Sequence, residues 1–190
     1  MNKGIDITDK ELITSILSGN DSAFKVLYHR YKRTHMLTCL RYIPNRQEAE
    51  DVLQEAYISI YNDLYQFDSN RASFKTWSSK VVINRCLKKL RKNTVPTVFQ
   101  NILDFRYKFI ARSSAIENLN IEYLSKVING LPKGYRTVFN MYVVDGYTHK
   151  EIANLLNISE STSKTQLMRA KKLLRNCLNE EEYTSQESYA

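Results

Sequence analysis

Proline and glycine are scarce in this chain of 190 residues, which contains only 3 prolines and 5 glycines. Collagen-like and low-complexity disordered chains are rich in these residues, so their scarcity excludes both classes. The apolar content, 43%, is ordinary for a folded globular protein. The length allows one domain or two small helical ones.

Cysteine is also rare, and long apolar runs do not occur. Cys39, Cys86 and Cys177 are odd in number, lie far apart and have no CxxC spacing, so we expect small buried side chains or simple thiols. No apolar run is long enough to cross a bilayer, and the first 15 residues contain no signal-peptide core. We therefore expect a cytosolic protein that does not insert into a membrane.

Acidic residues are outnumbered, with 20 Asp and Glu against 28 Lys and Arg, which gives a net charge of +8. Such a surplus of positive charge favours a polyanionic partner. The imbalance is strongest near the C-terminus, where no acidic residue occurs from Ser161 to Asn179.

The stretch Tyr147–Arg175 has the pattern of a helix-turn-helix. Thr148 and Glu151 fit a capping box at the start of a short helix, and Ser159 is placed to cap a second, longer helix after a tight turn. The second helix has an apolar face at Leu167, Ala170, Leu174 and Leu178, and an opposite face that is polar and basic. An ordinary helical hairpin is the alternative, but the one-sided charge favours insertion of the second helix into the major groove of DNA.

Two helices are predicted before this stretch near the N-terminus. The first spans about Asp9 to Leu17, and the second begins at Asp21 or Ser22 and ends at Pro44. The apolar pattern of the second includes Phe24, Leu27, Tyr28, Tyr31, Met36, Leu37, Leu40 and Ile43. His29 and His35 lie on it without a third ligand at suitable spacing, so we interpret them as surface or packing residues and not as a metal site.

A third helix has two contrasting faces. Its apolar face comprises Ala49, Val52, Leu53, Ala56, Tyr57, Ile60 and Leu64, and its other face carries Asp51, Gln54, Glu55, Ile58 and Asn62. An acidic face in a basic protein suits docking to another protein, although a plain solvated face fits the pattern equally well. A metal-dependent nucleic-acid enzyme using Glu48, Glu50, Asp51 and Glu55 is disfavoured, because neither a histidine nor a second acidic cluster accompanies them.

A polar loop, Phe67 to Ser73, precedes a fourth helix that starts at Phe74. One of its stripes carries Trp77, Val81, Asn84, Lys88 and Arg91, an aromatic-to-basic series that suits unpaired nucleic acid. Spacing alone slightly favours the alternative, in which Trp77 and Val81 are buried against the preceding helix.

The helical pattern breaks at Asn93. We predict an all-α protein with two helical domains, at residues 1–92 and 117–178, joined by a linker at 93–116 and followed by a frayed acidic tail at 179–190. Within the second domain, a single helix is predicted from Lys133 to Val144.

Two segments resemble one known family in the same order. EAEDVLQEAYISIYNDLYQFDSNRASFKTWSSKVVINRCLKKLRK (48–92) resembles region 2 of bacterial sigma factors, and LPKGYRTVFNMYVVDGYTHKEIANLLNISESTSKTQLMRAKKLLR (131–175) resembles region 4. No recognisable domain lies between them, so the chain looks like an extracytoplasmic-function (ECF) sigma factor.

The resemblance implies roles for particular residues. Asp51, Gln54, Glu55 and Ile58 would bind core RNA polymerase. The minus-ten element would be opened and held by Phe67, Asn70, Arg71, Ser73, Trp77, Val81, Asn84, Lys88, Arg91 and Lys92, with the loop receiving a flipped base. The minus-thirty-five element would be read by Ser159, Ser161, Thr162, Lys164, Thr165, Met168, Arg169 and Lys172.

The resemblance further implies a promoter-binding partner of RNA polymerase, controlled by an anti-sigma factor, with no cofactor, no metal and no enzymatic activity of its own. The alternative is a stand-alone helix-turn-helix regulator that binds an operator without polymerase. The chain departs from the family at residues 161–166, STSKTQ, where the family often has Gly-Thr-Val-Lys-Ser-Arg. Ser163 there replaces an apolar packing residue and Gln166 replaces a cation, so the promoter sequence is not implied.

Overall fold

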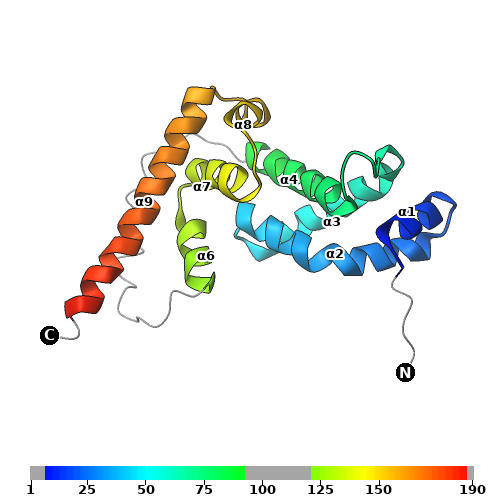
Figure 1. Ribbon diagram of the computed structural model, residues 1–190, viewed down its shortest axis with the longest axis horizontal. Coiled ribbons are helices and arrows are strands. Elements are labelled where there is room, and N and C mark those ends of the chain that lie inside the picture. The colour runs from blue at the N-terminus through cyan, green and yellow to red at the C-terminus, as the bar shows by residue number, and fades with distance from the viewer. Residues whose placement is uncertain (1–6, 93–120, 188–190) are drawn as a thin grey trace. The chain divides into compact units, whose positions relative to one another are not determined.

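The structure, a computed structural model, describes residues 7–92 and 121–187, without the side chains of Lys92, Ile121, Glu122 and residues 178–187. Helices are the regular secondary structure throughout the described ranges (Figure 1). The chain divides into two compact units, Met1–Lys92 and Asn93–Ala190, which we call unit 1 and unit 2. The predicted all-α fold with two helical domains is confirmed.

Unit 1 contains α1 (Asp9–Leu17), α2 (Asp21–Tyr42), α3 (Arg46–Asn62), the 3-10 turn η1 (Leu64–Gln66) and α4 (Phe74–Lys92). The helices α2, α3 and α4 pack on one another, and α1 packs on α2 (Figure 1). The first helix has the predicted bounds because a capping box starts it: the Glu11 backbone N–H donates to Thr8 Oγ1, and the Thr8 backbone N–H donates to Glu11 Oε2 at 2.8 Å.

The core of unit 1 follows the predicted apolar faces, with one exception. All seven apolar residues expected from α3 and the turn after it are buried. Leu37, however, is 58% exposed, contrary to the pattern we assigned to α2. The helical period places it on one stripe with Val26, Arg30 and Arg33, all of which are exposed, so Leu37 lies on the solvent side of the helix.

A buried polar network joins the three long helices of unit 1. His35 on α2 is fully buried, with Nδ1 2.9 Å from the Tyr57 hydroxyl on α3 and Nε2 3.1 Å from Ser78 Oγ on α4. Burial lowers the pKa of His35 to about 4, so the ring is neutral near pH 7. His35 is therefore a packing residue, as predicted, whereas His29 is exposed. Cys39 and Cys86 are also buried in this core.

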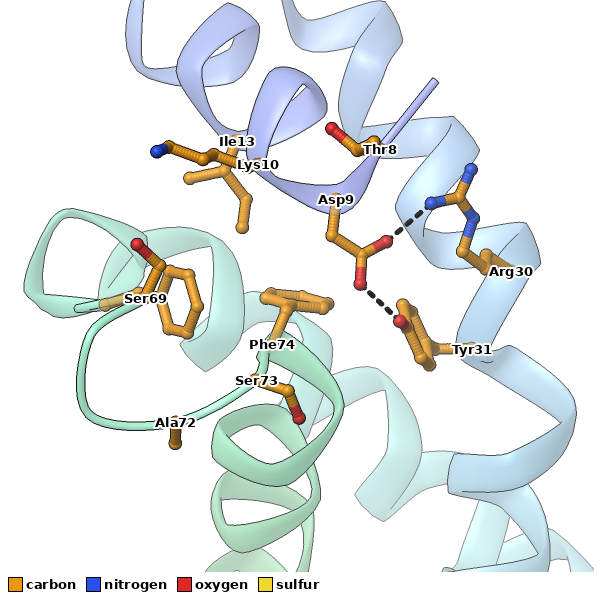
Figure 2. Close-up of a pocket in the computed structure, with 11 residues that line it drawn as sticks. Thr8, Asp9, Lys10, Ile13, Arg30, Tyr31, Ser69, Ala72, Ser73 and Phe74 are labelled. Carbon is orange, nitrogen blue, oxygen red and sulfur yellow. Dashed lines mark hydrogen bonds and ion pairs between the residues drawn. The ribbon is translucent and has the colours of Figure 1, made fainter. Parts of the chain in front are cut away.

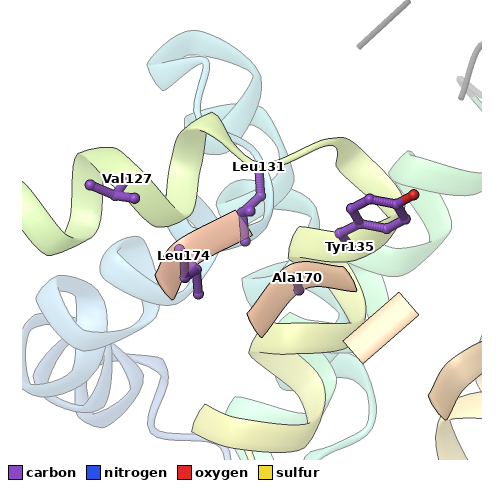
Figure 3. Packing of buried hydrophobic residues seen from close by; sticks show 5 residues of the cluster. All are labelled: Val127, Leu131, Tyr135, Ala170 and Leu174. Carbon is purple, nitrogen blue, oxygen red and sulfur yellow. The ribbon is translucent and has the colours of Figure 1, made fainter. Parts of the chain in front are cut away.

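Unit 2 contains α6 (Ile121–Gly130), α7 (Lys133–Phe139), the π-helical turn η2 (Asn140–Val144), α8 (His149–Leu156) and α9 (Glu160–Glu187). Its core cluster contains Val127, Leu131, Tyr135, Ala170 and Leu174, which bring α6 and α7 onto one face of α9 (Figure 3).

Two elements of unit 2 differ from the prediction. The expected single helix Lys133–Val144 ends at Phe139 and continues as η2, where the Asp145 backbone N–H donates to the Asn140 carbonyl at 3.0 Å. The π-helical turn stands at the end of the helical segment, so no further helical turns follow it whose shifted period could reveal it. The second difference is that α9 extends to Glu187, where we expected fraying after Asn179; the added residues include four glutamates, which favour helices.

The linker prediction, residues 93–116, and residues 117–120 and 188–190 lie outside the described residues. None of the helices in the described ranges is both long and apolar enough to cross a membrane.

Candidate nucleic-acid and polymerase interfaces

The helix-turn-helix is present in unit 2, and local hydrogen bonds build it. A capping box starts α8: the Thr148 backbone N–H donates to Glu151 Oε2 at 2.8 Å, and the Glu151 backbone N–H donates to Thr148 Oγ1 at 3.2 Å. Asn157 ends the helix in the left-handed region, with φ at 55°. Ser159 Oγ then accepts the Thr162 backbone N–H at 3.0 Å and starts α9.

The helix α9 presents an exposed polar and basic face. Every residue that the resemblance placed on the minus-thirty-five element is exposed, namely Ser159, Ser161, Thr162, Lys164, Thr165, Met168, Arg169 and Lys172. The opposite side of the helix buries Leu167, Ala170 and Leu174. Helix α9 therefore combines a buried apolar side with an exposed side whose positive charge complements the negative charge of a phosphate backbone.

Two side chains on this helix lie toward α7. Arg169 Nη1 donates to the Tyr135 hydroxyl at 3.3 Å. Gln166 is half-buried, and a Cβ placed on Gly134 would lie 3.4 Å from Gln166 Oε1. The residue that replaces a family cation thus packs against the neighbouring helix.

The acidic face of α3 in unit 1 is exposed at Asp51, Gln54, Glu55 and Ile58, and the Ile58 side chain is 62% exposed. Gln54 and Ile58 also line an apolar groove of about 550 Å³ between α2 and α3. Four aromatic rings line it: the Phe24 and Tyr61 centroids are 5.0 Å apart, and those of Tyr28 and Tyr57 are 4.7 Å apart. An exposed isoleucine beside an aromatic groove is typical of a docking surface for a protein.

The loop 67–73 forms one wall of a pocket of about 520 Å³ (Figure 2). Phe67 and Ser73, which we expect to contact the minus-ten strand, line it together with Ser69, Ala72 and Phe74. The rings of Phe67 and Phe74 are part of an aromatic cluster with Trp77, whose centroid lies 5.6 Å from that of Phe67. An aromatic wall of this kind can stack against an unpaired base.

Asn70 and Arg71, predicted to contact the minus-ten strand, do not line the pocket. Instead, both interact with Asp68: the Asn70 backbone N–H donates to Asp68 Oδ1 at 2.9 Å, and Arg71 Nε lies 3.4 Å from Asp68 Oδ2. These contacts shape the turn that carries the pocket residues.

The opposite wall of the pocket comes from α1 and α2, which the sequence did not reveal. Figure 2 shows Asp9 between Arg30 and Tyr31; the ion pair with Arg30 Nη1 measures 2.5 Å, and the Tyr31 hydroxyl donates to the other carboxylate oxygen. Burial, together with the bond to Asp9, raises the pKa of Tyr31 to about 12. Thr8, Lys10 and Ile13 complete this wall. The partners are more than twenty residues apart in sequence, so no local pattern signals them.

The stripe along α4 divides into two parts. Trp77 and Val81 are half-buried, whereas Asn84, Lys88 and Arg91 are exposed. The alternative of a buried stripe is therefore partly right for the first two residues. The side chain of Lys92 lies outside the described residues. No cluster of three or more histidine, cysteine or acidic side chains that could hold a metal occurs among the residues that the structure describes.

These surfaces define a helical protein in which one unit presents a helix-turn-helix with a basic face, and the other combines an acidic helix face beside an aromatic groove with an aromatic pocket. Comparison with known proteins agrees with this class. The family model for sigma-70 region 2 matches residues 27–95, and that for sigma-70 region 4 matches residues 121–174, so the two together cover well over half of the chain.

Similar proteins span nearly the whole chain. The ECF RNA polymerase sigma factor SigW of Bacillus subtilis is 29% identical over 185 residues, covering 90% of this chain and 97% of that protein. The ECF RNA polymerase sigma-E factor of Escherichia coli K12 is 24% identical over 181 residues, covering 90% and 94%. The chain belongs to the sigma-70 family, within its ECF group.

Two solved structures share the fold. CnrH in complex with the cytosolic domain of CnrY aligns with a TM-score of 0.51 at 20% identity, covering 91% of this chain and 98% of that one. The sigma factor RpoE in complex with the anti-sigma factor NepR from Bartonella quintana aligns with a TM-score of 0.52 at 15% identity, covering 82% and 96%.

Proposed function

We propose that this protein is a sigma factor that binds core RNA polymerase, recognises promoter DNA at two separated elements and promotes strand opening. The observation that supports this best is the order of two family regions in one chain, each on its own compact unit. It acts by binding and not by catalysis, and we expect it to work in the cytosol, beside the polymerase.

The two units divide the work. In unit 2, α9 enters the major groove of the minus-thirty-five element, where its lysines contact phosphates and its shorter side chains reach base edges. In unit 1, the acidic face of α3 with Ile58 docks on polymerase. Phosphate contacts fix the register of the complex and make promoter binding sensitive to salt.

The pocket at loop 67–73 receives a base flipped out of the minus-ten strand. The half-buried ring of Phe67 offers a surface for stacking, with Phe74 buried behind it, and Ser69 and Ser73 offer hydroxyls. Unstacking a base costs a few kcal/mol, so a pocket that binds the flipped base lowers the free energy of the open complex relative to the closed one. Asn84, Lys88 and Arg91 on the exposed part of α4 then contact the melted strand.

An anti-sigma factor is the regulatory partner that this proposal implies. Two proteins of the same fold were solved in complex with other proteins, CnrH with CnrY and RpoE with the anti-sigma factor NepR. A comparable regulator of this chain would inhibit it by covering the same surfaces that polymerase and promoter need.

The test is transcription in vitro with purified core polymerase on a template library with randomised sequence upstream of a reporter. We expect the full chain to give transcripts whose templates share two conserved elements, and core polymerase alone to give none. A stand-alone regulator would instead bind a duplex tightly without polymerase and would start no transcripts. Sequencing the transcribed templates therefore separates the two functions and reports the promoter.

A further inference from the structure

We propose that His149 and Ser163 are positioning residues that set the orientation of α9 on the minus-thirty-five element. The proposal rests on the proposed function, because it concerns how the recognition helix is held. Neither residue belongs to the exposed set that faces DNA; both act through the neighbours that do.

Ser163 is a polar residue at a fully buried position of the helix-turn-helix. Its side chain is 0% exposed, and it lies one turn into α9, where its backbone N–H donates to the Ser159 carbonyl at 3.0 Å. Its hydroxyl lies 2.9 Å from Nδ1 of His149, which is the first residue of α8. A buried hydroxyl without a partner costs free energy, so this bond determines which arrangement of α8 and α9 is stable.

The second partner, His149, is itself held in place. Its ring stacks on that of Tyr142 in η2, with centroids 4.5 Å apart and an interplanar angle of 22°. The chain of contacts therefore runs from the π-helical turn through the start of α8 into the first turns of α9. One aromatic stack and one hydrogen bond thus link η2 to both helices of the helix-turn-helix.

This linkage acts at the part of α9 that would meet the bases. Thr162 and Lys164 flank Ser163 and are both exposed. Successive helix residues are rotated by about 100°, so fixing Ser163 on the inner side also fixes the directions of its two neighbours. A hydrogen bond is directional, whereas an apolar contact tolerates sliding and rotation. The His149–Ser163 bond thus restricts the rotation of the recognition helix about its own axis.

The experiment uses the full chain with core polymerase on the randomised template library. Ser163→Ala removes the hydroxyl, and His149→Phe removes the hydrogen bond while keeping a ring for Tyr142. We expect each variant to lower transcript yield from the wild-type upstream element by about 3- to 10-fold, in line with the loss of one hydrogen bond. We also expect the preferred bases at that element to change, while the affinity for core polymerase stays the same.

The double variant tests the coupling between the two residues. It contains neither the buried hydroxyl nor the ring nitrogen. We therefore expect its transcript yield to equal that of the single variant with the lower yield, and not to fall by the two single-variant reductions multiplied together. Thr137→Val is the matched control, because this buried hydroxyl donates to the Lys133 carbonyl at 2.8 Å within its own helix. It should lower stability without changing the preferred bases.

The outcomes separate the two proposals. If wild-type chain selects no upstream element, the proposed function fails. If wild-type selects an element and folded Ser163→Ala and His149→Phe variants select the same element with the same yield, only the positioning proposal fails. Should these variants not fold, Ser163→Cys, which is nearly isosteric and a weak hydrogen-bond partner, takes their place; unchanged selection by that variant would equally overturn the proposal.

Discussion

The two units of this protein solve the problem of a small helical core in different ways. Unit 1 packs three long helices around a buried polar network, in which His35 contacts Tyr57 and Ser78. Unit 2 relies on a compact apolar cluster between two short helices and α9, and on end caps and one polar bridge within the helix-turn-helix. In unit 1 the buried polar contacts join three long helices, whereas in unit 2 the buried Ser163 joins the starts of α8 and α9.

The surfaces of the two units also differ in shape. Three packed helices and a loop leave unit 1 with a groove of about 550 Å³ and a pocket of about 520 Å³, both lined by aromatic rings. Unit 2 instead presents one exposed helix with a basic face. Concave aromatic surfaces suit a docking protein and unpaired bases, whereas a projecting helix fits the major groove of a duplex. The surface shape of each unit therefore suits the ligand that we assign to that unit.

The largest effect should come from removing the charges on each surface in turn. Asp51→Ala with Glu55→Ala should weaken binding of the full chain to core polymerase by about 10- to 100-fold, because the docking face loses its charged contacts. Titration of labelled chain with core polymerase, followed by fluorescence anisotropy, measures this change.

The variant on the basic face of unit 2, Lys164→Ala with Lys172→Ala, should leave the affinity for core polymerase unchanged. It should reduce the salt dependence of promoter binding by the holoenzyme. These lysines are cleaner probes than Arg169, which also donates to Tyr135. Loss of core binding in the lysine variant, or its retention in the acidic variant, would contradict the division of labour between the units.

A smaller effect concerns acid pH, and it should distinguish the two cores. The pKa of His35 is lowered to about 4 by burial, whereas an unfolded histidine titrates near 6.5. Between these values the unfolded chain binds more protons than the folded one, so stability is lost as pH falls. We expect the free energy of unfolding of unit 1 to drop by about 2 kcal/mol between pH 7 and pH 5 from this group.

Trp77, the single tryptophan of the chain, lies in unit 1, so its fluorescence reports urea unfolding of that unit. The variant His35→Gln cannot titrate and can still form a hydrogen bond, and it should show a flatter dependence on pH. An equal slope in wild type and variant would mean that other groups cause the acid sensitivity.

The smallest effect comes from two matched helix caps. Thr8 with Glu11 in unit 1 and Thr148 with Glu151 in unit 2 form the same capping box, with nearly the same hydrogen-bond lengths. Thr8→Ala and Thr148→Ala should each cost about 1 kcal/mol. Only Thr8→Ala should shift the Trp77 fluorescence transition, while far-UV circular dichroism detects both. A shift of the Trp77 transition by Thr148→Ala would show that the units do not unfold separately.

Much of this architecture could be predicted from local patterns. The capping box at Thr148, the tight turn after the first helix and the cap at Ser159 are recognisable because each depends on residues within four positions of one another. The apolar face of α3 follows from period alone. The exposure of Leu37 was not predicted, because an apolar residue on the solvent side cannot be told from a core residue by its type. The π-helical turn η2 was not predicted either, because it ends the helical segment and no later turns show the shift in period.

The candidate interfaces likewise divide into parts that local spacing predicts and parts that depend on how the helices pack. The exposed faces of α3 and α9 could be predicted, since a helix face is a matter of spacing. The pocket could be predicted only on the loop side, at Phe67 and Ser73. Its other wall, with Asp9, Arg30 and Tyr31, depends on how α1 lies against α2.

The sequence by itself determined most of the helical segments, the caps that start them and most of their apolar faces, because these follow from contacts between residues close in the chain. Only the tertiary structure decided that His35 is buried between Tyr57 and Ser78, that Asp9 borders a pocket, and that Ser163 meets His149. These contacts join residues 14 or more positions apart, so they form only when whole helices pack, and no local preference specifies them.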